Sequence, residues 1–401
     1  MFDFSSFLSN KAFITEDHHV YTYADLLGLS ERFSEHLVPR SLIFIGCENS
    51  LESIVAYVSC LRSGVVPLLL SRDVPDETLY HLEAIYHPRY CWFPSRRDLL
   101  VKGKEKYSLG GYSLIQYDGD SPVLPEGLAL LLTTSGSTGS PKLVRLSHDN
   151  LKSNACSIIE YLKITSSEKA ITSLPMYYSY GLSVLNSHLL AGATLLLTDK
   201  SYVQREFWKF VLEEKATSFA GVPFTYEILK KMRFEKFLPS SVKVMTQAGG
   251  KLNSSLIKYF SEYARLHDIR FYVMYGQTEA TARMSYLPAE YTLNKVGSVG
   301  VAIPGGHFSL IDEDGMRIVS PNVEGELVYE GSNVFWGYAE SLDDLFKGDE
   351  NKGILYTGDL AYVDSEGFYY ISGRKKRFLK LYGNRISLDF VESIVKDHCQ
   401  E

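Results

Sequence analysis

Short apolar runs alternate with helical patterns in the first part of the chain, and this alternation narrows the possible folds more than any other feature. The runs at 41–46, 65–70 and 89–93 are apolar almost throughout, and the segments between them, 50–64 and 77–86, carry apolar residues at helical spacing. Strands that are apolar on both faces are buried, and strands joined through helices run parallel. The pattern therefore predicts a parallel, doubly wound α/β sheet.

The same alternation returns between 150 and 275, and the pattern changes after about residue 290. The later segments are short, alternate apolar and polar residues, and are interrupted by Gly and Asp, which is typical of an antiparallel, barrel-like sheet. We therefore predict an α/β fold with two doubly wound βα subdomains and a distorted antiparallel β-barrel subdomain. The predicted division is 1–165 and 166–290 for the α/β subdomains, 291–372 for the barrel, 1–376 for the whole core, and 377–401 for a hinge and the start of a C-terminal lid domain.

Composition excludes several classes of partner. The 401 residues include 48 acidic and 41 basic side chains, which give a net charge of -7, whereas a nucleic-acid-binding surface normally needs positive charge. Apolar runs such as 128–132 are far shorter than a bilayer span, so we predict no membrane span and no nucleic-acid partner. The N-terminus lacks a basic stretch followed by an apolar one, and the 5 cysteines are scattered, without a CxxC pair. We therefore expect a cytoplasmic protein without a disulfide framework.

The segment 129–150 carries the clearest chemical signal. An apolar strand runs directly into a loop of small residues, TTSGSTGS, which ends in Pro141 and Lys142. Small residues let the backbone approach a ligand, and their amides and hydroxyls can bind phosphate oxygens. Lys142 adds a positive charge, although the spacing of Gly136, Gly139 and Lys142 differs from that of a Walker A loop. A flexible linker is the alternative, but linkers do not usually emerge directly from a buried strand.

Two later segments also place polar residues at the ends of expected strands. The strand 271–275 leads into YGQTE, where Glu279 could hold Mg²⁺ at the edge at which open α/β sheets bind ligands. Asp359 follows Thr-Gly at another strand end, where its carboxylate could accept both hydroxyls of a ribose within reach of Arg374. For each of these segments taken alone, an ordinary turn is an equally good interpretation.

Together and in this order, TTSGSTGSPK, YGQTE, YTGD and GRKKRFLK resemble the phosphate loop, the adenine and magnesium motif, the ribose motif and the hinge of the adenylate-forming superfamily. This superfamily includes acyl-CoA synthetases, luciferases and peptide-synthetase adenylation domains. The resemblance covers essentially the whole chain and implies the fold predicted above. It also implies an AMP-forming acid–thiol ligase. The carboxylate of an acid would attack the α-phosphate of ATP, giving an acyl-adenylate and pyrophosphate, and a thiol would then displace AMP.

The resemblance implies a role for each matching position. The catalytic residues would be Lys142 at the outer phosphates, Thr278 at the α-phosphate and Glu279 at Mg²⁺. Lys376 would occupy the hinge. The implied cofactors are ATP and Mg²⁺, with coenzyme A as co-substrate, or phosphopantetheine in its place. The remaining nucleotide-binding positions are Thr134, Ser135, Gly136, Ser137, Thr138 and Gly139 in the phosphate loop, Ala248, Gly249 and Gly250 beside the adenine, Tyr275 and Gly276 at the adenine, and Asp359 and Arg374 at the ribose.

One departure from the family pattern concerns the acid. Tyr178 stands where the family often has His, so its ring either shapes the acyl pocket or packs in the core. The neighbouring sequence has no carboxylate of the kind that amino-acid-activating members use to hold an ammonium group. We therefore expect a small carboxylic acid that is not an amino acid, either aryl or short- to medium-chain acyl. The predicted pocket wall consists of Tyr178, Tyr180, Phe219, Val222, Gln247 and Thr281, with Gly249 and Tyr275.

A second departure is that the chain ends soon after Lys376, whereas the family has a longer lid domain. We expect most of the lid to be missing, and adenylation and thioester formation to be slow without it. Three functions remain open. The acyl group would pass to coenzyme A, or to the phosphopantetheine of an acyl carrier protein, or the chain would bind nucleotide without turnover. The presence of Lys142, Glu279 and Asp359 favours an enzyme.

Overall fold

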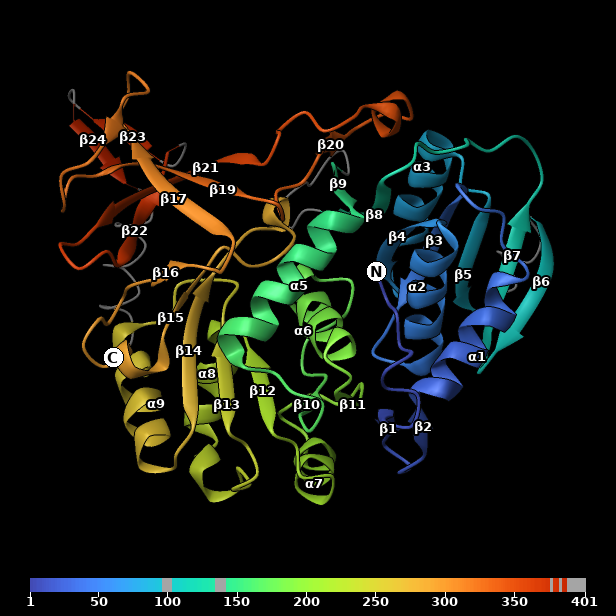
Figure 1. Cartoon of the computed structure of the whole chain (residues 1–401), viewed down its shortest axis with the longest axis horizontal. Helices are drawn as coiled ribbons and strands as arrows, with labels where there is room; N and C mark the ends of the chain where they lie inside the picture. Colours follow the sequence, from blue (N-terminus) through green and yellow to red (C-terminus); the bar gives the residue numbers. More distant parts are fainter. Residues whose placement is uncertain (96–102, 134–141, 376–377, 382–383, 388–401) are drawn as a thin grey trace.

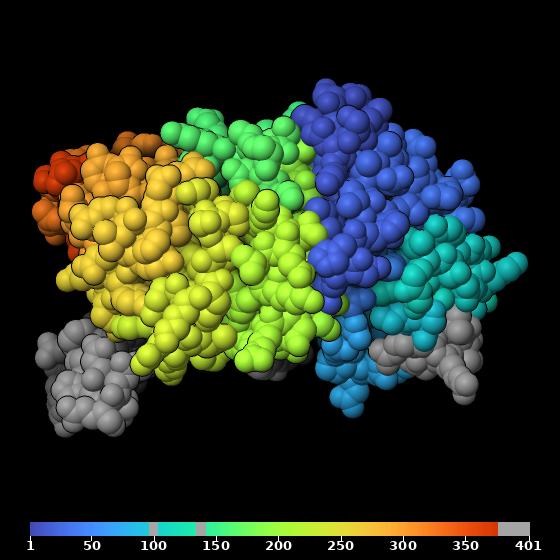
Figure 2. All heavy atoms as spheres, turned by 90° about the horizontal axis from the view of Figure 1, so that it is seen from below, coloured from blue at the N-terminus to red at the C-terminus, as the bar shows by residue number. Residues whose placement is uncertain are grey.

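The computed structural model describes residues 1–95, 103–133, 142–375, 378–381 and 384–387. Two large mixed sheets lie side by side, each covered by helices, and a smaller antiparallel sheet lies at one end of the molecule (Figure 1). Figure 2 shows the same arrangement as a continuous packed body, with the antiparallel part at the end opposite the N-terminal part. In the part of the chain that the structure describes, none of the helices has the length and apolar character needed to cross a bilayer.

The N-terminal sheet has the strand order β20-β9-β8-β4-β3-β5-β7-β6, with parallel strands from β8 to β5. Helices α1 and α2 pack on one face, and α3 packs on the other, which makes the sheet doubly wound. Ser50 caps the start of α2, and Gly64 ends it in the left-handed conformation. The elements of this part are α1 (Tyr23–Ser34), β3 (Leu42–Cys47), α2 (Leu51–Ser63), β4 (Val66–Ser71), α3 (Asp76–Tyr86), β5 (Tyr90–Pro94), β6 (Gly103–Leu109), β7 (Tyr112–Tyr117), β8 (Leu128–Thr133), β9 (Leu143–Ser147) and β20 (Gly337–Ala339).

The central sheet has the strand order β16-β15-β14-β13-β12-β10-β11-β1-β2, and its strands run parallel from β14 to β1. Helices α5 and α6 cover one face, and α7, α8 and α9 cover the other. Its elements are β1 (Lys11–Thr15), β2 (Val20–Thr22), α5 (His148–Leu162), β10 (Lys169–Ile171), α6 (Ser179–Leu190), β11 (Thr194–Leu197), α7 (Arg205–Glu213), β12 (Ser218–Gly221), α8 (Pro223–Lys231), β13 (Val244–Gln247), α9 (Ser254–Leu266), β14 (Arg270–Tyr275), β15 (Ser285–Leu287) and β16 (Val301–Ala302).

The third sheet is antiparallel, with the strand order β18-β17-β19-β21-β22. Its strands are β17 (Gly306–Ile311), β18 (Arg317–Ile318), β19 (Gly325–Gly331), β21 (Ile354–Val363) and β22 (Tyr369–Arg374), and a separate hairpin joins β23 (Phe378–Leu381) and β24 (Asn384–Ser387). Both predicted doubly wound sheets and the antiparallel part are confirmed. Among the described residues the third sheet does not close on itself, so it is an open sheet rather than a complete barrel.

Strand pairing crosses the predicted subdomain boundaries, which stay a prediction. β1 and β2 fall within the range 1–165 but pair in the central sheet, where β1 lies beside β11. β20 falls within 291–372 but pairs with β9 of the N-terminal sheet. Sequence neighbours do not determine these pairings, because the partner strands come from distant parts of the chain.

Candidate nucleotide-binding site

The ends of β13 and β14 form the base of the candidate site. After β13 the chain turns through Ala248, Gly249 and Gly250, and Gly249 has a φ of +83° that favours glycine. After β14, Gly276 passes so close to the loop that follows that an added Cβ would lie 1.8 Å from the carbonyl oxygen of Ala282. Both turns therefore depend on the glycines that the sequence placed at these strand ends.

A carboxylate on the third sheet faces the end of β14. Asp359 on β21 is buried, and its Oδ2 accepts hydrogen bonds from the Tyr275 hydroxyl at 2.5 Å and from Gln277 Nε2 at 2.9 Å. Its Oδ1 accepts a hydrogen bond from Arg374 Nε at 3.1 Å, since the two residues are paired across β21 and β22. Burial raises the pKa of Tyr275 well above its usual value, and the neighbouring Asp359 carboxylate adds to the shift, so the phenol stays neutral and donates. Three of the predicted nucleotide-binding residues thus meet in one cluster.

A second polar group lies on the other side of the β14 end. The Tyr338 hydroxyl on β20 donates a hydrogen bond to Glu279 Oε1 at 2.7 Å. Lys142 Nζ lies 3.8 Å from the centre of the Tyr338 ring and 3.4 Å from Glu340 Oε1. Burial raises the pKa of Tyr338, and the Glu279 carboxylate adds to this shift, so its hydroxyl remains a donor. Lys142 and Glu279 therefore both contact Tyr338, Lys142 at the face of the ring and Glu279 at the hydroxyl. The sequence segments that carry them are more than a hundred residues apart.

The turn that carries Glu279 is strained and is held by Asn333. Thr281 has φ of 66° and ψ of -52°, and Ala282 N–H donates to the Ala280 carbonyl at 2.7 Å, which together define a rare γ-turn with a positive φ. The buried Asn333 amide donates to the carbonyls of Ala280 at 2.8 Å and Arg283 at 3.0 Å. The Thr281 hydroxyl in turn donates to the Asn333 carbonyl at 2.8 Å. The connection between β19 and β20, which carries Asn333, therefore fixes the conformation of the predicted magnesium motif.

The predicted acid-binding residues lie at the start of α6 and at the facing strand ends. Tyr178 is half-buried, and its hydroxyl lies 2.5 Å from the Cβ that a side chain at Gly249 would have, with Val222 also adjacent. The next residue, Ser179, places its hydroxyl oxygen 3.1 Å from that of Thr278. Tyr178, Val222 and Gly249 are therefore brought together beside Thr278, as the pocket prediction requires.

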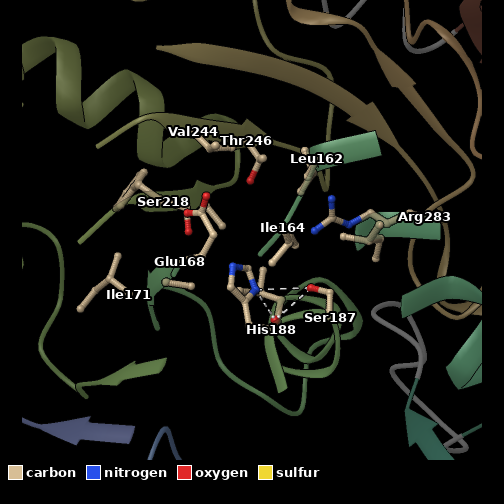
Figure 3. Close-up of a pocket in the computed structure, with 15 residues that line it drawn as sticks. Leu162, Ile164, Glu168, Ile171, Ser187, His188, Ser218, Val244, Thr246 and Arg283 are labelled. Atoms are coloured by element: carbon tan, nitrogen blue, oxygen red, sulfur yellow. Dashed lines mark hydrogen bonds between the residues drawn. The ribbon is translucent and has the colours of Figure 1, made fainter. Parts of the chain in front are cut away.

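Other predicted pocket residues lie deeper or elsewhere. Tyr180 is buried and donates from its hydroxyl to the Thr246 carbonyl at 2.9 Å. Gln247 is buried too, and its Nε2 donates to the Gly250 carbonyl at 2.9 Å. Phe219 stacks on Trp208 at 5.8 Å in the core beneath α7 and α8 and also lines a cavity between α6 and the central sheet (Figure 3), whereas its neighbour Ala220 lies with Tyr178 and Tyr180. A role of Phe219 in binding the acid stays a prediction.

Several predicted residues fall outside the described part of the chain. These are the phosphate-loop positions Thr134, Ser135, Gly136, Ser137, Thr138 and Gly139, and the hinge residue Lys376. Their roles stay predictions. On either side of the phosphate-loop positions, β8 ends at Thr133 and β9 begins at Leu143, directly after Lys142.

Comparison with known proteins identifies the family. The family model for AMP-binding enzymes matches residues 6–339. A 2-succinylbenzoate–CoA ligase of Bacillus cereus is 31% identical over 412 residues, which cover 98% of this chain and 83% of that protein. The chain belongs to the AMP-binding enzyme family. The resemblance drawn from the four motifs is thereby confirmed, together with the prediction of an enzyme of this class.

Solved structures agree on the fold. The o-succinylbenzoate CoA synthetase of Bacillus subtilis, in complex with the acyl-adenylate intermediate, superimposes with a TM-score of 0.79 at 24% identity, covering 97% of this chain and 80% of that one. The same protein in complex with ATP and magnesium ion gives a TM-score of 0.77 at 25% identity, covering 97% and 82%. These neighbours share the arrangement of the sheets that surrounds the candidate site.

Sequence reasoning missed three residues that hold the site together. Gln277 was read as part of the YGQTE motif but received no role, although it donates to Asp359. Tyr338 and Asn333 were not considered, because nothing in the local sequence shows that they face Glu279 and the strained turn. Tyr338 and Asn333 both lie in one short segment, GSNVFWGYAE, which connects the third sheet to the strand that pairs with β9. Their closeness within this segment was the signal that the sequence offered.

Proposed function

We propose that this protein activates a carboxylic acid with ATP, forming an acyl-adenylate and pyrophosphate, and then transfers the acyl group to coenzyme A. The observation that carries the proposal is the pair of polar groups on either side of the β14 end. Asp359 with Tyr275 on one side suits a ribose and its base. Glu279 with Lys142 on the other side suits phosphates and their metal ion. The name of the Bacillus cereus relative supports coenzyme A as the acceptor.

The residues of each group would act mainly through position and charge. Asp359 would accept the two ribose hydroxyls in place of the hydrogen bonds that it now receives from Tyr275 and Gln277. Thr278 would contact the α-phosphate, and Lys142 would neutralise the outer phosphates. Phosphoryl chemistry needs little acid–base catalysis from the protein, so aligned donors and cations supply most of the rate enhancement.

A magnesium ion fits this site. Among the described residues no group of three or more His, Cys, Asp and Glu side chains could hold a metal, but Mg²⁺ does not need such a group. It usually keeps several waters and binds through one or two carboxylates plus the phosphates of its substrate. Glu279 supplies one half-buried carboxylate, oriented by Tyr338. The ion, when bound, would neutralise charge on the phosphates, and Glu279 would hold it.

We further propose that the acid lacks an amino group and is aryl or of short to medium chain length. The side chains at the entry to α6, from 177 to 180, are three tyrosines and a serine, and none of them supplies a carboxylate for an ion pair with an ammonium group. The neighbouring Val222 and Ala248 are apolar and pack with Tyr178. The relative named for 2-succinylbenzoate, an aryl acid, supports this class.

Within the cell, a reducing compartment such as the cytoplasm suits the buried thiols of Cys47 and Cys60.

Pyrophosphate release with ATP, Mg²⁺ and a panel of aryl, aliphatic and α-amino acids tests the proposal. We expect release with aryl or aliphatic acids and none with amino acids. Turnover with a free α-amino acid alone would contradict the choice of acid. Binding of nucleotide and acid without pyrophosphate release from any acid would instead assign the second candidate function, a binding protein without turnover.

The acceptor is tested in a second step. The acid that supports pyrophosphate release is incubated with ATP and either coenzyme A or a phosphopantetheinylated carrier protein, and thioester formation is followed by mass spectrometry. We expect the coenzyme A thioester. Thioester formation on the carrier protein alone would replace coenzyme A by that acceptor and leave the adenylation step intact.

A further inference from the structure

Arg145 lies buried inside the connection that carries Tyr338. It belongs to β9, and its side chain is 0% exposed. Gly337 on β20 is paired with it across the two strands, which lie side by side in Figure 1. Gly337 has a φ of +141°, and a Cβ at this position would lie 2.6 Å from Arg145 Nη2. The glycine therefore leaves the space that the guanidinium occupies.

Residues 336–350, here called the 336–350 loop, start and end beside Arg145. The Trp336 N–H donates to the Arg145 carbonyl at 2.9 Å, and the Glu350 N–H donates to the Trp336 carbonyl at 2.8 Å, so the two ends of the loop meet. At the outgoing end, Arg145 Nε donates to the Tyr338 carbonyl at 3.2 Å, and Nη2 donates to the Trp336 carbonyl at 3.4 Å. The side chain therefore ties β20 to β9 in addition to the pairing of the two backbones.

The same guanidinium holds the returning end of the 336–350 loop. Its Nη1 donates to the Gly348 carbonyl at 3.2 Å and to the Lys347 carbonyl. Its Nη2 also pairs with the exposed carboxylate of Glu350. A guanidinium presents five N–H donors in a fixed plane, whereas an ammonium group is a compact charge with three donors. One arginine can therefore bind both ends of the loop at once, which a lysine in its place could not do.

The middle of the 336–350 loop carries the side chains that meet the proposed metal and phosphate site. The Tyr338 hydroxyl donates to Glu279 Oε1 at 2.7 Å. Glu340 Oε1 lies 3.4 Å from Lys142 Nζ. Both side chains lie between the two ends that Arg145 holds, so the position of the loop on β9 decides where they point.

We propose that Arg145 is a positioning residue for the binding of the metal ion. By fixing both ends of the 336–350 loop on β9, it keeps the Tyr338 hydroxyl where it orients the Glu279 carboxylate. Among the described residues its side-chain hydrogen bonds go to this loop and not to Glu279 or Lys142, so its effect passes through Tyr338. The inference rests on the proposed function, which assigns Glu279 to Mg²⁺.

Calorimetric binding of ATP at a series of Mg²⁺ concentrations tests the inference without requiring turnover. The measured quantity is the Mg²⁺ concentration at which ATP binding is half-maximal. Arg145→Met removes all the side-chain contacts, and Arg145→Lys keeps a positive charge for Glu350 but loses the planar set of donors. We expect each variant to raise this concentration about 10-fold, as is typical when a partner of a metal ligand is lost, with an unchanged circular dichroism spectrum.

Arg40→Met is the matched control. The half-buried Arg40 guanidinium also binds carbonyls, those of Leu124 at 2.9 Å, Gly64 at 3.3 Å and Leu128 at 3.4 Å. Leu128 begins β8, at the end of the strand remote from the phosphate-loop positions. The control variant should lower stability and leave the Mg²⁺ requirement unchanged. A rise as large as in Arg145→Lys would show that destabilisation alone causes the effect, and would overturn the inference.

Tyr338→Phe separates positioning from stability. In this background the hydrogen bond that Arg145 maintains is already absent, so adding Arg145→Lys should raise the Mg²⁺ requirement by about 2-fold or less. Fully additive effects would overturn the inference, because Arg145 would then act independently of Tyr338. An unchanged Mg²⁺ requirement in folded Arg145→Lys would overturn it as well.

If both arginine variants fail to fold, Glu350→Ala decides. Its carboxylate is exposed, and its loss removes one contact at the returning end of the loop. A rise in the Mg²⁺ requirement smaller than 10-fold then supports the inference, and an unchanged requirement overturns it. A wild-type protein that binds no ATP at any Mg²⁺ concentration would instead refute the proposed function, and the inference with it.

Discussion

Replacement of Asn333 by Ala tests how the connection between β19 and β20 holds the magnesium motif. The side chain donates two hydrogen bonds, to the carbonyls of Ala280 and Arg283, and its Oδ1 accepts a third from the Tyr329 hydroxyl at 2.8 Å. Asn333 and Tyr329 are both buried. The substitution therefore leaves the Tyr329 hydroxyl without its partner and removes one of two hydrogen bonds from each carbonyl, because Ala280 also accepts from the Ala282 N–H and Arg283 from the Asn154 amide.

The expected cost follows from these three groups. The phenol that loses its partner costs about 1–3 kcal/mol and each of the two lost hydrogen bonds to a carbonyl about 0.5–1.5 kcal/mol, so Asn333→Ala should lower the free energy of unfolding by about 2–6 kcal/mol. Tyr329→Phe removes only one of the three hydrogen bonds and should cost about 1–2 kcal/mol. Urea denaturation followed by the fluorescence of the 3 tryptophans measures both values. Where the variant remains folded, the γ-turn at Thr281 should relax, and the Mg²⁺ concentration for half-maximal pyrophosphate release should rise.

The comparison of the two variants is decisive. If Asn333→Ala destabilises the protein no more than Tyr329→Phe does, the hydrogen bonds from the Asn333 amide to the two carbonyls do not contribute to stability. An unchanged requirement for Mg²⁺ in the folded variant would show that the conformation of the turn does not position Glu279. Either result refutes the proposed role of Asn333 in holding the turn at Thr281.

Three further predictions concern single side chains. Tyr338→Phe removes the donor to Glu279 Oε1 and should raise the Mg²⁺ requirement about 10-fold with the fold unchanged; an unaltered magnesium titration would refute the role of Tyr338. Asp359→Ala should weaken nucleotide binding by about 1–3 kcal/mol in calorimetry, and unchanged affinity for ATP and AMP would remove Asp359 from the ribose site. His188 has a folded-state pKa of about 4, below the 6.5 of a free histidine, so the unfolded chain binds the proton more readily and stability falls as the pH drops from about 6.5 toward 4. His188→Gln should reduce this loss in urea denaturation at pH 7 and 5, whereas His81→Gln, at an exposed position on α3, should not.

Local patterns predicted much of the fold. The helical segments predicted at 50–64 and 77–86 correspond to α2, with its Ser50 cap and Gly64 stop, and to α3. Caps, periodicity and glycines are local signals, so a short window of sequence is enough to find them. YGQTE was found in the same way, because it follows the end of β14, whereas YTGD lies within β21 and not at the strand end that the sequence predicted.

Local sequence patterns did not predict which distant strands pair with one another. The position of β1 beside β11 depends on a contact between residues about 180 apart. Whether the third sheet closes into a barrel depends in the same way on whether its two edge strands pair with each other. At the site, local patterns do not determine which side chains of the four-residue strand β12 face Tyr178, because tertiary packing sets the orientation of so short a strand. Tyr338 and Asn333 were not predicted either, because their roles depend on contacts with Glu279 and with the Ala280 carbonyl, which are distant from them in the sequence.

The segment from Thr278 to Arg283 links the two halves of the proposed reaction. Thr278 meets Ser179 at the start of α6, Glu279 meets Tyr338 on β20, and Arg283 lies over Tyr180 in the acid region. The segment covers only six residues, so a shift at its middle moves Glu279, which would hold the metal ion, together with Arg283 and the Tyr180 ring beneath it. A loosened turn should therefore raise the Mg²⁺ requirement and the KM of the acid in parallel. Two independent sites would respond separately, and that difference distinguishes a coupled segment from neighbouring residues that share only a sequence motif.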